Sequence, residues 1–196
     1  MKNRKRRNRK LRRAISIIVE GKTELWYFQL MKEAEKEDLY TIDIKPKLPQ
    51  KMALDAQFNL VTEDCELFDY VFWVIDLDQI IHNHLTQKLQ DYRQKLKDNA
   101  FILINNPCLE FWFLLHFQNT GKHYSKCSRV ITDLRKHITN YQKTEKFFKT
   151  NNVYKIFKPY QEKAIERAKR LSKQATSLPS PKAEIYKIFE VIRKMN

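Results

Sequence analysis

Short apolar runs alternate with longer segments whose apolar residues recur at helical spacing through the first 117 residues. The runs are rich in β-branched and aromatic residues and favour buried strands. The segments between them favour helices. Strands are predicted at 14–19, 40–48, 70–75 and 100–104, and helices at 23–37, 52–64, 85–98 and 108–117. This alternation is typical of an α/β fold with a mostly parallel four-stranded sheet flanked by helices.

The rest of the chain has a different pattern and contains no segment typical of a central strand. Helices are predicted at 128–138, 159–175 and 183–195, with a proline-containing break at 178–181 before the last one. We therefore expect three parts, which are a basic tail (1–13), an α/β core (14–117) and an α-helical extension packed on the core (118–196). No apolar run reaches the roughly 18 residues of a membrane span, so we expect a cytoplasmic protein without a membrane partner.

Carboxylates follow two of the predicted strands, where burying them without a partner would be costly. Glu20 ends the first strand, and Asp76 and Asp78 end the third. An Asp-x-Asp on extended backbone would place both side chains on one side of the strand. Because the carboxyl ends of parallel strands meet at one edge of the sheet, the three carboxylates form a candidate Mg²⁺ site. Helix or turn capping is the alternative for the two aspartates.

The formal charge of +15 is unevenly distributed along the 196 residues. Residues 1–13 carry nine basic and no acidic side chains, 14–116 carry 10 basic and 17 acidic, and 117–196 carry 19 basic and six acidic. Basic flanks attract a phosphate backbone, and a divalent cation would let the acidic centre receive it. With only two glycines, the chain lacks the glycine clusters of dinucleotide-binding fingerprints and P-loops.

The chain has three widely spaced cysteines, Cys65, Cys108 and Cys127. The odd number and the absence of a C-x-x-C pair argue against a zinc ribbon and favour free thiols in a reducing cytoplasm. We expect Cys108 to be a core residue rather than a nucleophile, because the sequence shows no ordered base beside it.

Further polar residues accompany the strand-end carboxylates. Glu110 and His116 lie in the apolar helix 108–117, which is predicted to be buried, so both need partners and are candidate site residues. Glu110 could instead favour the helix N-terminus, and His116 could be a hydrogen-bonded core histidine. Glu24 could contact the metal or reach a helix cap. Lys22 could meet a phosphate or be solvated.

In the extension, basic residues are interleaved with aromatic rings, a combination suited to single-stranded nucleic acid. The candidates for backbone contacts are Tyr154, Lys155, Lys158 and Arg167. Most of these rings could instead pack on the sheet as an ordinary helical cap.

Several stretches resemble one protein family. Strand-Glu-Gly followed by strand-Asp-x-Asp is similar to the Toprim fold of topoisomerases, primases and small nucleases. More narrowly, residues 19–28 (VEGKTELWYF) resemble the first motif of the RloB-like family, and 106–117 (NPCLEFWFLLHF) match its most distinctive stretch. Residues 165–171 and 185–187 fit its tail.

That resemblance implies a Toprim-like fold, a link to restriction-modification and other bacterial defence loci, and metal-dependent phosphodiester cleavage. It makes Glu20 a general base or acid, or a residue that orients the metal, with Asp76 and Asp78 holding Mg²⁺ (or Mn²⁺). Residues 79–81 (QII) stand where many Toprim proteins have a small residue or glycine.

We therefore expect a nuclease acting on DNA or RNA, with possible partner proteins of a defence system. Two alternatives remain open at this point. One is a non-catalytic nucleic-acid-binding subunit of a defence complex. The other is a phosphodiesterase that acts on a small nucleotide.

Overall fold

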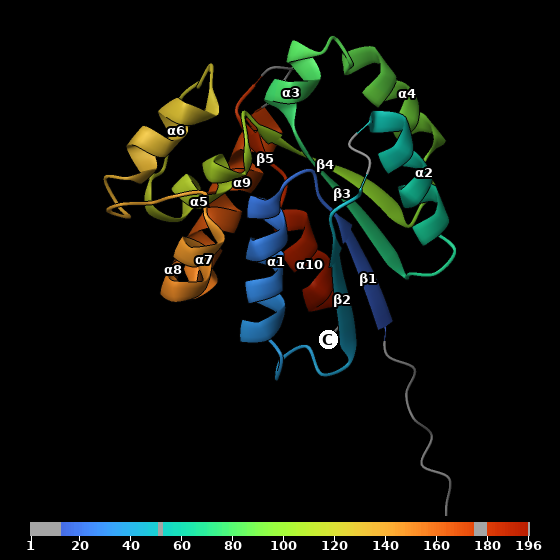
Figure 1. The fold of residues 1–196 in the computed structure, drawn as a ribbon, viewed down its shortest axis with the longest axis horizontal. Helices are drawn as coiled ribbons and strands as arrows, with labels where there is room; N and C mark the ends of the chain where they lie inside the picture. Colours follow the sequence, from blue (N-terminus) through green and yellow to red (C-terminus); the bar gives the residue numbers. More distant parts are fainter. Residues whose placement is uncertain (1–12, 51–52, 175–179, 196) are drawn as a thin grey trace, which may run out of the picture.

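The computed structural model describes residues 13–50, 53–174 and 180–195. A five-stranded sheet with the strand order β2-β1-β3-β4-β5 lies at its centre (Figure 1). The first four strands are parallel, which confirms the predicted α/β class, and β5 runs antiparallel to β4. Their bounds are β1 Arg13–Ile18, β2 Ile42–Lys47, β3 Tyr70–Asp76, β4 Ala100–Asn106 and β5 Lys182–Ala183.

Two strands differ from their predicted form. β5 comes from the extension, and its two residues are too few to produce a readable pattern. β2 is shorter at both ends than the predicted strand 40–48, and it includes Pro46. Proline lacks an N–H for a second neighbour, and β2 tolerates it because it is an edge strand.

Helices connect the parallel strands and make up most of the extension. They are α1 Lys22–Ala34, α2 Leu54–Asp64, α3 Leu77–His82, α4 Thr86–Lys95, α5 Leu109–Phe117, α6 Cys127–Leu134, α7 Glu145–Asn151, α8 Val153–Phe157, α9 Gln161–Gln174 and α10 Tyr186–Met195, with a 3₁₀ turn at Lys158–Tyr160. The short helices α3, α7 and α8 were not predicted. None of the helices in the described part of the chain combines the length and apolar composition that a membrane crossing requires.

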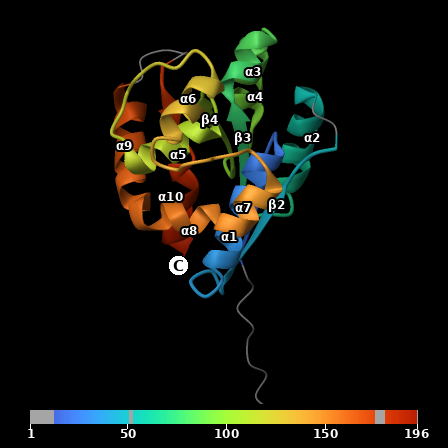
Figure 2. The same cartoon turned by 60° about the vertical axis from the view of Figure 1, so that its left-hand side comes forward.

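The two faces of the sheet are covered by different helices (Figure 2). Successive side chains of a strand point to opposite faces. In β3, Phe72 and Val74 pack with α1, α5 and the extension, whereas Val71, Trp73 and Ile75 pack with α2, α3 and α4. Alternate residues of β3 therefore pack against opposite helical layers. By this alternation, Asp76 lies on the same face of the sheet as Phe72 and Val74, the face covered by α1, α5 and the extension.

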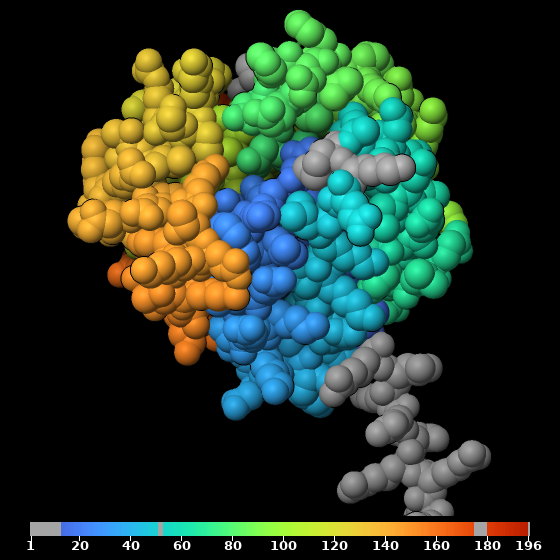
Figure 3. All heavy atoms as spheres, in the orientation of Figure 1, coloured from blue at the N-terminus to red at the C-terminus, as the bar shows by residue number. Residues whose placement is uncertain are grey.

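Helix α5 is the buried centre of the first layer, as its all-round apolar sequence predicted. All its residues from Leu109 to His116 are buried. Residues of the extension join the same apolar cluster as α1 and α5. In the space-filling view the extension (orange) and α1 (blue) meet along a seam (Figure 3). α5 begins at Leu109, one residue after the predicted start, and Pro107 directly precedes its N-cap residue Cys108.

A disulfide joins Cys108 and Cys127, which corrects the expectation of free thiols. The two residues are 19 apart in sequence, and their Cα atoms lie 5.7 Å apart because α6 folds back against α5. The sequence pattern around the two cysteines does not indicate that α6 packs against α5. Cys65 is a free, buried cysteine. Of the predicted basic tail, Arg13 begins β1, and residues 1–12 lie outside the described part of the chain.

Candidate functional site

Glu20 and Asp76 meet at the carboxyl ends of the neighbouring strands β1 and β3, as the sequence predicted. The backbone N–H of Asp76 donates a hydrogen bond to Oε2 of Glu20 over 3.0 Å. The Gln57 side chain also bonds the Glu20 carboxylate, and its own Oε1 accepts a 2.8 Å bond from Nε1 of Trp73. The orientation of Glu20 is therefore set from two directions.

Asp78 reaches the same edge by a different route from the one expected. Asp76 is the last residue of β3, and the chain turns into α3 at Leu77. Asp78 consequently lies in the first turn of a helix, and the predicted extended Asp-x-Asp is wrong. Asp76 is the N-cap residue of α3 but makes no side-chain cap bond, whereas the Asp78 carboxylate accepts a hydrogen bond from the backbone of Gln79 in the first turn.

Glu24 adds a carboxylate from the first turn of α1, and its chain folds back over Gly21. A Cβ placed on Gly21 would lie 2.5 Å from Oε2 of Glu24, so any larger residue there would displace this carboxylate. Glu24 is buried, and it repels Glu20 closely enough to raise the pKa of that carboxyl. The Glu-Gly pair thus gives the site both a carboxylate and the space for a second one.

Glu110, in the first turn of α5, contacts residues of the extension near the site. Its side chain is fully buried. Oε1 accepts a 2.9 Å hydrogen bond from the Tyr141 hydroxyl and lies 2.9 Å from Nζ of Lys143. Oε2 lies 3.0 Å from Sγ of Cys127. Tyr141 and Lys143 were not among the predicted site residues, because no motif links them to a carboxylate about 30 residues earlier.

The electrostatics of this site indicate an excess of negative charge. Burial, together with repulsion from neighbouring carboxylates, raises the pKa of Glu20 and that of Glu24 to about 7 each. Burial first, and then Glu24, Glu110 and Glu20, hold the pKa of Asp76 well above its usual value. Burial also raises the pKa of Asp78. Burial and mutual repulsion thus disfavour the charged forms of these carboxyls, and a bound cation would offset both effects.

Unpaired buried polar atoms point to the same conclusion. Oδ1 of Asp76 is buried and has no hydrogen-bond partner in the described structure, and neither has the side-chain amide of Asn105. Asn105 pairs with Asp76 across β3 and β4, so both side chains lie on the same face of the sheet. Carboxylate and amide oxygens are ligands that Mg²⁺ accepts. Among the described residues, Glu20, Asp76 and Asp78 do not place three ligand atoms within 4.8 Å of one another, so a bound ion would draw these side chains together. Asn105 directly follows the predicted strand 100–104, and this position is the signal that could have identified it.

His116, by contrast, does not reach the carboxylates. Its Nδ1 donates a 2.9 Å hydrogen bond to the carbonyl of Trp112, and its ring lies against Trp112 and Phe157. Burial lowers the pKa of His116 to about 3. The imidazole is therefore a neutral core side chain, as the alternative interpretation held.

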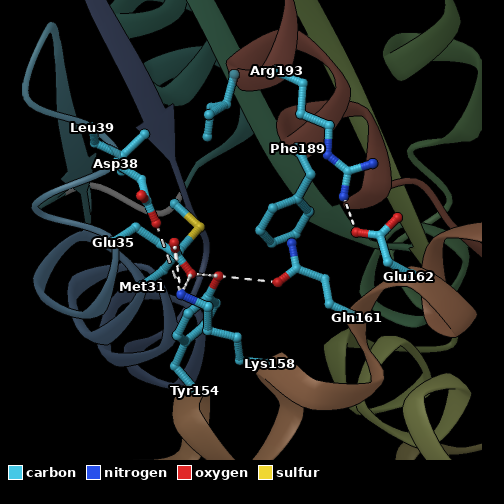
Figure 4. A pocket seen from close by; sticks show the side chains of 11 residues that line it. Met31, Glu35, Asp38, Leu39, Tyr154, Lys158, Gln161, Glu162, Phe189 and Arg193 are labelled. Carbon is cyan, nitrogen blue, oxygen red and sulfur yellow. Dashed lines mark hydrogen bonds and ion pairs between the residues drawn. The ribbon is translucent and has the colours of Figure 1, made fainter. Parts of the chain in front are cut away.

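The expected nucleic-acid contacts in the extension are mostly occupied by internal partners. Tyr154 is buried, its hydroxyl donates to Glu35 over 2.7 Å, and Lys158 pairs with the same carboxylate. Figure 4 shows both in a hollow of about 270 Å³ at the C-terminal end of α1. Glu35 lies about 16 Å along α1 from Glu24, so this hollow is separate from the carboxylates.

The other three predicted contacts differ in their environment. Arg167 donates to the carbonyls of Leu115 (2.7 Å) and His116 (3.1 Å), at the end of α5. Lys155 is exposed on α8, beside Tyr154. Lys22 is exposed at the start of α1, two residues from Glu20, and is the one predicted contact that the fold keeps close to the carboxylates.

Comparison with known families agrees with this arrangement. The family model described as RloB-like protein matches residues 15–193. The chain belongs to the RloB-like family. No curated protein and no solved structure matches it. The match spans both the α/β core and the extension of this RloB-like protein, and the fold is consistent with a Toprim-like α/β architecture.

Proposed function

We propose that this RloB-like protein is a Mg²⁺- or Mn²⁺-dependent nuclease of bacterial defence that acts in the cytoplasm. The observation that carries the proposal is the hydrogen bond that joins Glu20 and Asp76 at one sheet edge, with an unpaired buried oxygen on Asp76 and with Asp78 near enough to repel Glu20. Membership of the RloB-like family suggests the defence-associated role.

Each residue has a distinct part in this proposal. Asp76 and Asp78 hold the metal, with Glu20 completing or orienting the set. A bound divalent ion would neutralise the scissile phosphate and lower the pKa of a water molecule. In the metal-free protein burial raises the pKa of Glu20 to about 7. A bound cation would lower this pKa and keep the carboxylate ready to accept a proton. Because Oε2 accepts the Asp76 N–H, the proton would reside on Oε1.

A nucleic acid is the favoured substrate because of the charge distribution. Residues 117–196 carry 19 basic and six acidic side chains, and this segment reaches the carboxylates through Glu110. Basic residues beside a metal site attract a polyanion and concentrate it there. A small nucleotide carries fewer phosphates than a nucleic acid, so its binding would need fewer basic residues.

The test is a substrate panel with Mg²⁺, Mn²⁺ or EDTA. It comprises single- and double-stranded DNA and RNA, a cyclic nucleotide and a small phosphodiester. We expect the wild type to cleave a polynucleotide only with metal, and Asp76→Asn and Glu20→Gln to lose at least about 100-fold in rate. Asp98→Asn, an exposed aspartate outside the site, is the matched control and should keep full activity.

Each contrary outcome selects an alternative. Full activity in a double alanine variant of Asp76 and Asp78 would overturn the nuclease site. Salt-dependent binding that persists in EDTA, with no cleavage by any metal, would indicate a binding subunit. Turnover restricted to small phosphodiesters would indicate a nucleotide phosphodiesterase.

A further inference from the structure

Lys143 spans from the buried carboxylates to the solvent. It lies between α6 and α7, and its Nζ is 2.9 Å from Oε1 of Glu110. The Glu110 side chain is fully buried, whereas that of Lys143 is 40% exposed. Lys143 therefore pairs with a buried carboxylate while part of its side chain stays exposed to solvent.

The segment that carries Lys143 is held on both sides. Before it, Tyr141 is fully buried, its hydroxyl bonds Glu110, and its carbonyl accepts a 3.1 Å bond from Nε of Arg135. After it, Oγ1 of Thr144 caps α7 by accepting the N–H of Phe147 over 3.2 Å. Such anchoring holds a charged group in place before substrate binds, which is the condition for effective electrostatic catalysis.

The charges around Lys143 show that it belongs to the whole carboxylate cluster. Burial alone would lower the pKa of Lys143, but Glu110, Asp76 and Glu24 outweigh it and raise that pKa. The residue is therefore a permanent cation. An ammonium has three N–H donors, and Glu110 uses one. The contact with Sγ of Cys127 is long, at 3.5 Å, so at least one strong donor is available for an anionic oxygen.

We infer that Lys143 is a catalytic residue of the proposed phosphodiester hydrolysis and contacts a non-bridging oxygen of the scissile phosphate. The inference rests on the proposed function. In the reaction, a water oxygen forms a bond to phosphorus, the bond from phosphorus to the leaving oxygen breaks, and the water proton ends on the leaving group. Lys143 stays protonated and stabilises the negative charge on the phosphoryl oxygens.

The test compares Lys143→Met, which removes the charge, with Lys143→Arg, which restores it. Lys149→Met is the matched control, since Lys149 is an exposed lysine of α7 paired only with Glu145 among the described residues. We expect Lys143→Met to lower kcat about 100- to 1,000-fold, with KM within about threefold of wild type. Lys143→Arg should recover part of the loss. Mn²⁺ affinity, measured by calorimetry, should be unchanged or tighter, because a nearby positive charge is gone.

The inference is overturned if folded Lys143→Met keeps kcat within about threefold of wild type. A purely structural role would lower the melting temperature while leaving the rate per folded molecule intact. If Lys143→Met does not fold, Lys143→Gln replaces it, because glutamine keeps a donor for Glu110 but has no charge. The inference is then overturned if folded Lys143→Gln keeps kcat within about threefold of wild type. If the wild type itself does not cleave, the proposed function is overturned. If the wild type and the variant are both active, only the role of Lys143 is overturned.

Discussion

The backbone N–H of Asp76 donates to Oε2 of Glu20, so the two carboxylates at the ends of β1 and β3 are linked through main chain rather than through side chains alone. This bond fixes Oε2 of Glu20, and the Gln57 side chain also bonds the same carboxylate. Oδ1 of Asp76, by contrast, is buried and has no hydrogen-bond partner in the described structure.

Replacing Asp76 by Asn should stabilise the metal-free protein while abolishing its response to metal. The carboxylate is costly in its ionised form, because burial and three neighbouring carboxylates raise its pKa. Removing that charge should add about 1 kcal/mol to the free energy of unfolding in EDTA, or about 2–4 °C in melting temperature. Thermal melts with EDTA and with Mn²⁺ measure both effects. A lower melting temperature in EDTA, or a retained Mn²⁺ shift, would contradict the assignment.

The metal-free protein should lose stability as pH rises from about 4.5 to about 7. Glu20 and Glu24 have folded-state pKa values of about 7 against 4.5 for free carboxyls. Within this window the folded state binds more protons than the unfolded state, so the free energy of unfolding falls with pH. Each unit of pKa difference corresponds to about 1.4 kcal/mol.

Urea unfolding in EDTA at a series of pH values measures this slope. Glu20→Gln should make it shallower, because one of the two titrating groups is gone. The carboxyls with lowered pKa, such as Asp133, lose their contribution at more acidic pH and do not mask the effect. A free energy of unfolding that rises between pH 5 and 7 would refute the prediction.

The disulfide between Cys108 and Cys127 should stabilise the oxidised protein. It closes a loop across a sequence separation of 19, for which loop entropy predicts about 3 kcal/mol. Cys127→Ser, or addition of a reductant, should lower the free energy of unfolding by about this amount. Intact-mass analysis should show one free thiol after alkylation of the unfolded chain, from Cys65. Three alkylated thiols and no effect of reductant would show that the bond does not form.

Arg167→Met should destabilise the protein without weakening nucleic-acid binding. The guanidinium donates to two carbonyls at the end of α5, and losing these bonds should cost about 1–3 kcal/mol. Lys22→Met is the contrasting variant, because this exposed lysine lies beside the carboxylates. It should weaken binding uniformly and reduce the salt slope by about one. Fluorescence anisotropy at several salt concentrations, with Ca²⁺ in place of Mg²⁺, tests both; equal loss of affinity in the two variants would contradict the distinction.

The local sequence pattern predicted the position of Asp76 but not that of Asp78. The apolar run 70–75 predicts a strand that ends in carboxylates, and β3 does end at Asp76. Whether the next residues continue the strand or start a helix depends on where α3 packs, with Leu77 and Ile80 buried against the second layer. The position of Asp78 therefore followed from packing that no single segment reveals.

The sequence by itself determined the alternation of strands and helices, and with it the meeting of Glu20 and Asp76, because parallel strands bring their carboxyl ends to one edge. Only the tertiary structure decided that Tyr141 and Lys143 reach Glu110, and that Cys127 joins Cys108. Those contacts join residues 19 to 33 positions apart through the packing of the extension on α5. Hydrophobic periodicity shows which face of a segment is buried, but the partner buried against that face is selected by the packing of the whole chain.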